Sequence, residues 1–172
     1  ANERGVSIIG DLPIYVPLDS ADVWAEPDQF QLDETLTPTE VAGCPPDGFS
    51  PDGQLWGNPL FDWERMKGGN YRWWMRRIDF QFRIFDTLRI DHFRGLDEYY
   101  AIPYGDVNAR RGHWRPGPGK DFFRALRETL GERDIIAEDL GFMTDTVREL
   151  LAFSGYPGMK ILQFAFYNCD HT

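Results

Sequence analysis

Three charged side chains follow short apolar runs that are typical of β-strands. Arg89 and Asp91 lie in TLRIDHFRG (residues 87–95), and Glu138 lies in DIIAEDLG (residues 134–141). Side chains alternate along a strand, so Arg89 and Asp91 share one face. A guanidinium beside a carboxylate favours the ionised form and fixes its orientation. The spacing predicts an oriented nucleophile at Asp91, although a purely structural ion pair at a strand end fits it as well.

Glu138 ends the second run and has apolar neighbours before it. A carboxylic acid against apolar walls can serve as a proton donor, which makes Glu138 a candidate general acid. The other interpretation is an acid that caps the next helix. Asp139 suits that role better, because neighbouring residues on a strand point in opposite directions.

Asp91 and Glu138 are separated by one expected loop, one helix and one strand. We therefore expect them at the same end and on the same face of two adjacent parallel strands, which lie about 4.8 Å apart. Carboxyl groups so placed can approach the separation of about 5–5.5 Å that is typical of retaining glycosidases. This geometry predicts a covalent glycosyl-enzyme and leaves open whether water or a second sugar resolves it.

The elements that must position these residues alternate between strands and helices. We expect strands at residues 6–16, 87–93, 134–139 and 158–166, helices at 70–86, 121–130 and 144–153, and long loops at 17–69 and 94–118. Alternation of this kind is typical of the α/β class, either a doubly wound sheet or a barrel. Polar residues at the carboxyl ends of the strands favour the barrel, which needs about 250 residues. The prediction is a partial (β/α)8 TIM barrel with long βα loops that holds the middle strands only.

Composition limits the partners and the compartment. The formal net charge is −10, which opposes binding to nucleic acid. Two cysteines do not form a disulfide framework, and no apolar run is long enough to span a bilayer. We expect a cytoplasmic protein with no membrane or nucleic-acid partner, and its oligomeric state stays open. The chain starts and stops close to expected strands, so we interpret residues 1–172 as the central portion of one catalytic barrel domain, truncated at both ends.

Several motifs in order resemble those of one family. They are GDLPIYVPLDSADVW (10–24), GQLWGNPLFDW (53–63), LRIDHFRG (88–95), GPGKDFF (117–123), IIAEDLG (135–141) and GYPGMKILQFAF (155–166). Together they resemble the amylomaltase or disproportionating-enzyme family, within the α-amylase superfamily. The resemblance implies a 4-α-glucanotransferase that moves α-1,4-glucan segments between maltodextrins through a covalent intermediate, without a cofactor or a metal.

The resemblance also implies a role for each matching residue. Asp91 would be the nucleophile, Arg89 its charge partner and Glu138 the acid/base. The implied structural and sugar-contacting residues are Asp11, Asp47, Gln54, Trp56, Asn58, His92, Trp114 in a flexible loop over the acceptor groove, and Phe164 near the reaction centre. The superfamily also uses a third carboxylate in a Thr-His-Asp setting. No such motif occurs here, because Asp170 and His171 have the reverse order, so we expect the isolated chain to be inactive.

Three alternatives remain. Acids at strand ends also occur in metal-dependent isomerases and lyases, but Arg89 would place a cation beside the metal. An α-glucan hydrolase would use the same carboxylates with water as the acceptor. A non-catalytic glucan-binding fragment would keep the stacking aromatics and lose turnover.

Overall fold

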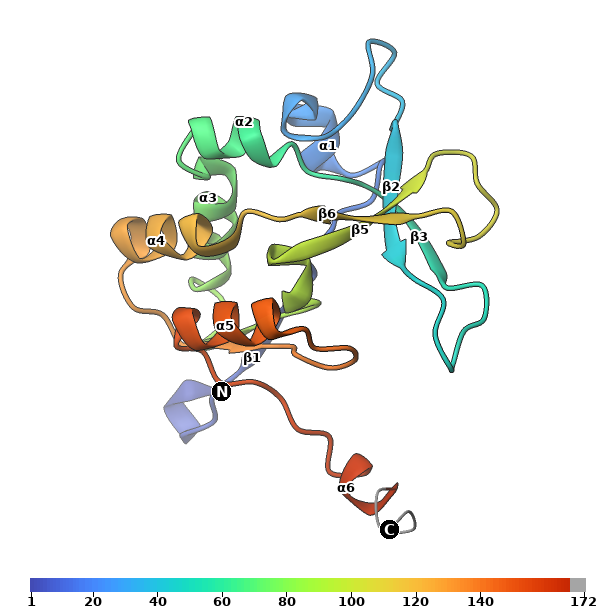
Figure 1. Ribbon diagram of the computed structural model, residues 1–172. Coiled ribbons are helices and arrows are strands. Elements are labelled where there is room, and N and C mark those ends of the chain that lie inside the picture. The colour runs from blue at the N-terminus through green and yellow to red at the C-terminus, as the bar shows by residue number, and fades with distance from the viewer. Residues whose placement is uncertain (168–172) are drawn as a thin grey trace.

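The computed structural model describes residues 1–167, apart from the side chains of Phe164 and Tyr167, and it contains two β-sheets flanked by helices (Figure 1). One sheet is parallel, with the order β1-β4-β7, and consists of β1 (Ile9–Leu12), β4 (Thr87–Ile90) and β7 (Ile135–Ala137). Leu88 pairs with Gly10 on one side and with Ile135 on the other. The predicted adjacency of the second and third strands is therefore confirmed.

The three expected helices form, with shifted bounds. They are α3 (Arg72–Gln81), α4 (Gly119–Leu130) and α5 (Asp145–Ser154), and they lie together on the left of Figure 1. Asn70 and Tyr71 have positive φ angles of 50° and 52°, so α3 begins after them. The Thr144 hydroxyl accepts a hydrogen bond from the Val147 amide at 3.3 Å, which confirms the predicted N-cap of α5. Gly131 ends α4 as expected.

The two segments expected to be loops contain a second, antiparallel sheet, on the right of Figure 1. Its order is β3-β2-β5-β6, and its strands are β2 (Glu40–Cys44), β3 (Gln54–Pro59), β5 (Glu98–Pro103) and β6 (His113–Pro116). The same segments hold α1 (Ala21–Ala25), α2 (Trp63–Gly68) and the 3-10 turn Pro27–Gln29. Two further 3-10 turns lie at Asn2–Arg4, before β1, and at Phe93–Leu96, where the second expected loop begins. The loop prediction was wrong because these strands lack the alternation of buried and exposed side chains that marks a strand in sequence. The middle residues of β2 and β5 are buried on both faces, and β6 is exposed throughout.

The strand expected at residues 158–166 was also wrong. Only Gly158 pairs, in parallel with Ala137, and a short helix, α6 (Phe164–Tyr167), follows. Leu162 and Phe166 are 71% and 74% exposed, so little apolar burial stabilises a strand there. The first expected strand is also shorter than predicted. It ends at Leu12, because Pro13 has no amide hydrogen with which to continue the ladder.

The hydrophobic core is rich in aromatic rings. Trp74 is fully buried, and its ring stacks on Trp63 at a centroid distance of 6.1 Å and meets Phe122 edge-on at 5.6 Å. Trp73 is buried in the same cluster, so half of the six tryptophans serve packing. Among the helices of residues 1–167, we find none with the length and hydropathy needed to cross a membrane.

Candidate active site

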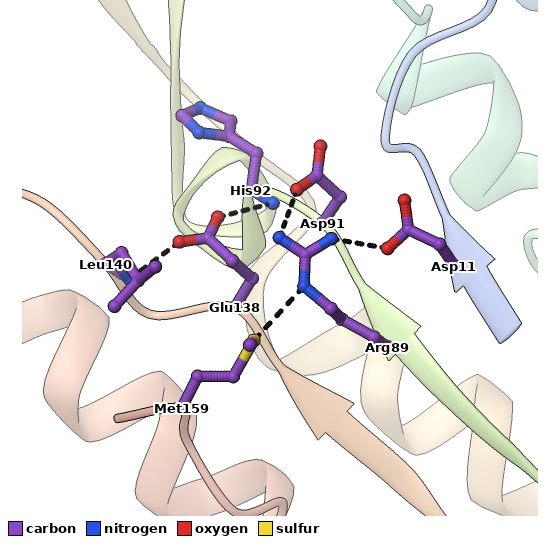
Figure 2. Close-up of polar contacts among 7 residues, drawn as sticks. All are labelled: Asp11, Arg89, Asp91, His92, Glu138, Leu140 and Met159. Carbon is purple, nitrogen blue, oxygen red and sulfur yellow. Dashed lines mark hydrogen bonds and ion pairs between the residues drawn. The ribbon is translucent and has the colours of Figure 1, made fainter. Parts of the chain in front are cut away.

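Arg89 lies between two carboxylates at the end of the parallel sheet (Figure 2). The register places Arg89 opposite Asp11, and the guanidinium forms an ion pair with it. Arg89 Nη2 also donates to Asp91 Oδ1 at 2.7 Å, and Nε donates to Met159 Sδ at 3.1 Å. Burial alone would lower the pKa of Arg89, but the hydrogen bonds and charges of the two aspartates raise it. The expected pairing of Arg89 with Asp91 is therefore present, and Asp11 joins it.

Asp91 is the first residue after β4. Its backbone amide donates to the Leu12 carbonyl at 3.0 Å, which fixes the chain as it leaves the sheet. The side chain is 40% exposed while one carboxylate oxygen accepts from Arg89. Asp91 is thus oriented by a cation and still open to a ligand.

Glu138 is the first residue after β7, and its amide donates to the Ile90 carbonyl at 2.9 Å. Its Oε2 accepts from the His92 amide at 2.9 Å and its Oε1 from the Leu140 amide at 2.8 Å (Figure 2). Ile90 pairs with Ala137 in the register, so the residues that follow them leave adjacent strands at the same end. Asp91 and Glu138 are neighbours as predicted, and backbone amides hold the Glu138 carboxyl group.

Asp139 has a different role from the one expected. It does not cap the next helix, because Thr144 is the cap of α5. Asp139 Oδ1 accepts from the Met159 amide at 2.7 Å, since the chain returns close to β7 at Gly158. Asp139 thereby fixes the residue whose sulfur contacts Arg89.

His92 follows the nucleophile candidate in the left-handed backbone region, with φ 50° and ψ 52°. Its ring meets the Trp56 ring edge-on at a centroid distance of 4.9 Å. Burial lowers its pKa to about 4; the charge of Asp91 raises it in part and that of Arg94 lowers it further. Nε2 is buried and has no hydrogen-bond partner among the residues described. His92 is therefore a neutral imidazole at physiological pH.

A cavity of about 180 Å³ opens beside Asp91. It is lined by Pro13, Ile14, Tyr15, Trp56, Asn58, Asp91 and His92. Trp56, Asn58 and His92, all expected to contact sugar, therefore lie around the same cavity as Asp91. Sequence reasoning missed Tyr15, which follows β1 and whose ring lies 6.1 Å from that of Trp56. The rule that selected residues after strand ends could have found it.

The other expected contacts lie elsewhere or have structural partners. Asp47 Oδ1 accepts from the Phe49 and Ser50 amides at 2.8 and 2.7 Å and so holds its own turn. Gln54 accepts from the indole N–H of Trp56 at 3.0 Å. Trp114 lies in β6, paired with Tyr100, and not in a flexible loop as expected. The side chain of Phe164 and all of Asp170 and His171 lie outside the described residues.

Within residues 1–167, we find no group of three His, Cys, Asp or Glu side chains arranged to hold a metal ion. The Arg89 guanidinium lies between the carboxylates of Asp11 and Asp91. Both carboxylates therefore share this one cation, which orients Asp91.

Comparison with known proteins adds the family. A family model described as 4-alpha-glucanotransferase matches residues 1–172. The chain belongs to the 4-α-glucanotransferase family. The 4-alpha-glucanotransferase of Streptococcus pneumoniae serotype 4 is 55% identical over 172 residues, which cover all of this chain and 34% of the relative. The enzyme of the same name from Aquifex aeolicus is 49% identical over 168 residues, 98% of this chain and 35% of the relative.

Solved structures of amylomaltases have the same fold. The amylomaltase of Streptococcus agalactiae, determined in complex with acarbose, has a TM-score of 0.94 and 46% identity over 97% of this chain. The amylomaltase of Corynebacterium glutamicum has a TM-score of 0.82 and 27% identity over 95% of it. These matches cover 34% and 23% of the two amylomaltase chains. This 4-α-glucanotransferase chain spans about a third of the length of the curated relatives it matches. The family resemblance of the motifs and the mixed α/β architecture are confirmed.

Proposed function

We propose that this chain is the central part of the catalytic (β/α)8 barrel of a 4-α-glucanotransferase that transfers α-1,4-glucan segments between maltodextrins. The parallel order β1-β4-β7, with helices between β4, β7 and the return at Gly158, supports the barrel. Functional side chains follow the carboxyl ends of its strands, where barrels carry their active sites. The coverage of a third of each relative supports a larger catalytic unit.

The reaction is a double displacement. The Asp91 carboxylate attacks the anomeric carbon of the donor, and the bond to the leaving oxygen breaks as Glu138 gives that oxygen a proton. Glu138 then takes the proton from a hydroxyl of the acceptor glucan, whose oxygen attacks the same carbon and releases Asp91. The third carboxylate that the resemblance implies would come from another part of the full-length protein.

One observation carries this proposal: Arg89 orients Asp91 on a strand that lies directly beside the one before Glu138. The guanidinium holds Asp91 Oδ1 by a hydrogen bond, and the two backbone amides hold Glu138 in one orientation. The adjoining cavity offers the Trp56 ring for stacking and the Asn58 amide for hydrogen bonds. A neutral α-glucan suits such a lining, and a relative that binds acarbose supports the ligand class.

The test is disproportionation of maltotriose by the full-length protein, followed by chromatography of glucose and longer maltodextrins. We expect a ladder of longer products from the wild type. Asp91→Asn and Glu138→Gln should each lower the rate by about 100-fold or more. Asp145→Asn is the matched control, because Asp145 is 95% exposed at the start of α5 and should keep full activity. Products that are only shorter than the substrate would indicate a hydrolase, and a nearly active Asp91 or Glu138 variant would mean that the site is misplaced.

A further inference from the structure

Arg94 is a buried cation for which the reaction described above has no use. It lies in the 3-10 turn Phe93–Leu96, shortly after Asp91, and its side chain is 10% exposed. Its Nη1 donates to the Phe142 carbonyl at 2.5 Å, and its Nη2 lies 3.5 Å from a carboxylate oxygen of Glu98. Burying a guanidinium is costly unless its partners are well placed. The position of Arg94 therefore depends on the groups around it.

The Arg94 guanidinium connects the 3-10 turn Phe93–Leu96, which follows Asp91, to the loop that follows Glu138. Phe142 lies two residues beyond Leu140, whose amide donates to Glu138 Oε1 at 2.8 Å. Gly141 between them has a φ of 88°, so the loop turns sharply there, and the Phe142 side chain is 80% exposed. The Arg94 guanidinium also lies 5.9 Å from the centroid of the Phe142 ring, so both the carbonyl and the ring of Phe142 face Arg94, which is one anchor of the loop.

Trp114 supports the other side of the guanidinium. The Arg94 Cζ atom lies 4.0 Å from the centroid of the Trp114 ring, a close cation–π arrangement. The ring itself is held edge-on by Tyr100 at 5.2 Å. Trp114 thus gives Arg94 a fixed platform on the antiparallel sheet, and Arg94 in turn spans the distance to the Glu138 loop.

We propose that Arg94 is a positioning residue for Glu138: by anchoring the Phe142 carbonyl against the Trp114 platform, it keeps the Leu140 amide on Glu138 Oε1. The inference rests on the proposed acid/base role of Glu138. Without Arg94 the loop loses its anchor, and the carboxyl group keeps only the His92 amide as a fixed partner. Glu138 can then rotate away from the leaving oxygen. Arg94 does not line the cavity beside Asp91, so substrate affinity should not depend on it.

The test compares two donors with the full-length protein. Maltotriose needs a proton on its leaving oxygen, whereas α-maltosyl fluoride releases fluoride without one. For Arg94→Met we expect kcat with maltotriose to fall about 10- to 100-fold with KM within about twofold. Release of fluoride in the first turnover should stay within about threefold of the wild type, because that step needs only the nucleophile. Arg94→Lys should retain intermediate activity, since an ammonium can bind the carbonyl but stacks less well on the indole.

Arg148→Met is the matched control, because Arg148 forms an exposed ion pair with Asp145 at the start of α5, and it should leave both reactions unchanged. An equal loss with both donors, or a rise in KM alone, would overturn the positioning role, as would full activity of Arg94→Met. Glu138→Gln in the same assay separates the two proposals. If Glu138→Gln still transfers maltotriose normally, the proposed function fails. If it shows the donor-dependent loss and the Arg94 variants do not, only this inference fails.

Discussion

At the scale of single residues, the site depends on one cation shared by two acids. Arg89 is 25% exposed, whereas its partners Asp11 and Asp91 are 60% and 40% exposed. The guanidinium is therefore the part of the cluster that the fold encloses, and the carboxylates face outward. A lysine here could not contact both acids in the same way, because it presents a single point charge and not a planar fork.

The neutral state of His92 makes a prediction about pH. Its pKa is lowered to about 4 by burial, and an unfolded histidine titrates near 6.5. Between these values the unfolded chain binds a proton that the folded chain does not, so the free energy of unfolding rises with pH from 4 to 6.5 and is level above. The effect is at most about 3 kcal/mol. His92→Asn, which suits the left-handed backbone, should remove it.

The measurement is urea unfolding of the full-length wild type and His92→Asn at pH 4.5 and pH 7. The stability difference between the two proteins should shift in favour of the variant at the lower pH. An equal difference at both pH values would show that His92 titrates alike in the folded and unfolded chain.

Sequence could predict some of these residue-level contacts and not others. The alternation of strand side chains found the pairing of Arg89 with Asp91, and the order of elements found that Glu138 lies next to them. The partners of the Glu138 oxygens were not predictable, because they are backbone amides in turns. Their directions depend on backbone angles such as the positive φ of His92, which strand and helix periodicity do not encode.

At the scale of elements, the helices α3, α4 and α5 and the strands β1, β4 and β7 could be predicted. The antiparallel sheet and the short helices α1, α2 and α6 could not. The helix α4 buries Phe122, Phe123 and Leu126 on one face, which is the helical spacing that the sequence displays. The strand β5 is buried on both faces by the layers around it, so its pattern carries no period of two. Tertiary packing thus decided its conformation, and local sequence did not.

The return of the chain beside β7 makes a prediction about Gly158. A Cβ atom built there would lie 2.3 Å from a carboxylate oxygen of Asp139, which holds the Met159 amide. Gly158→Ala should therefore displace Asp139 and destabilise the full-length protein by about 1–3 kcal/mol. Met159 should also move from Arg89, which should lower transferase activity.

Thermal unfolding and maltotriose assays of the full-length protein check this prediction. Gly68→Ala is the control, because an added Cβ there would meet no atom within 4 Å from the described residues outside its chain neighbours and its own helix backbone. Gly68 is helical, so stability should stay level or rise. A Gly158→Ala protein as stable and active as the control would contradict the close packing at this position.

At the scale of the whole molecule, apolar side chains are exposed beside β1 and around α3. Val6 and Ile9 are 55% and 60% exposed, and Phe80 and Ile84 are 55% and 56% exposed. Within the described residues β1 pairs only with β4, so its other edge is open. In the proposed barrel, further strands and helices would cover this edge and these side chains.

This surface predicts the behaviour of residues 1–172 expressed alone. We expect the isolated chain to self-associate and to show no disproportionation of maltotriose, because its apolar edge is open and the proposed mechanism takes its third carboxylate from another part of the full-length protein. Analytical ultracentrifugation and chromatography of the products test both points. A monomer with a sharp, reversible melt, or measurable transfer by the isolated chain, would contradict the partial-barrel interpretation.

In the proposed double displacement, Asp91 forms a covalent bond with the donor sugar, so trapping that adduct is the decisive experiment. Full-length Glu138→Gln treated with a 5-fluoro-α-glucosyl fluoride should accumulate the glycosyl-enzyme, since the nucleophile is intact and the second step lacks its base. Tandem mass spectrometry should locate the sugar on Asp91, and the additional change Asp91→Asn should abolish the adduct. A sugar found on another residue, or no adduct while transfer by the wild type proceeds normally, would show that Asp91 is not the nucleophile.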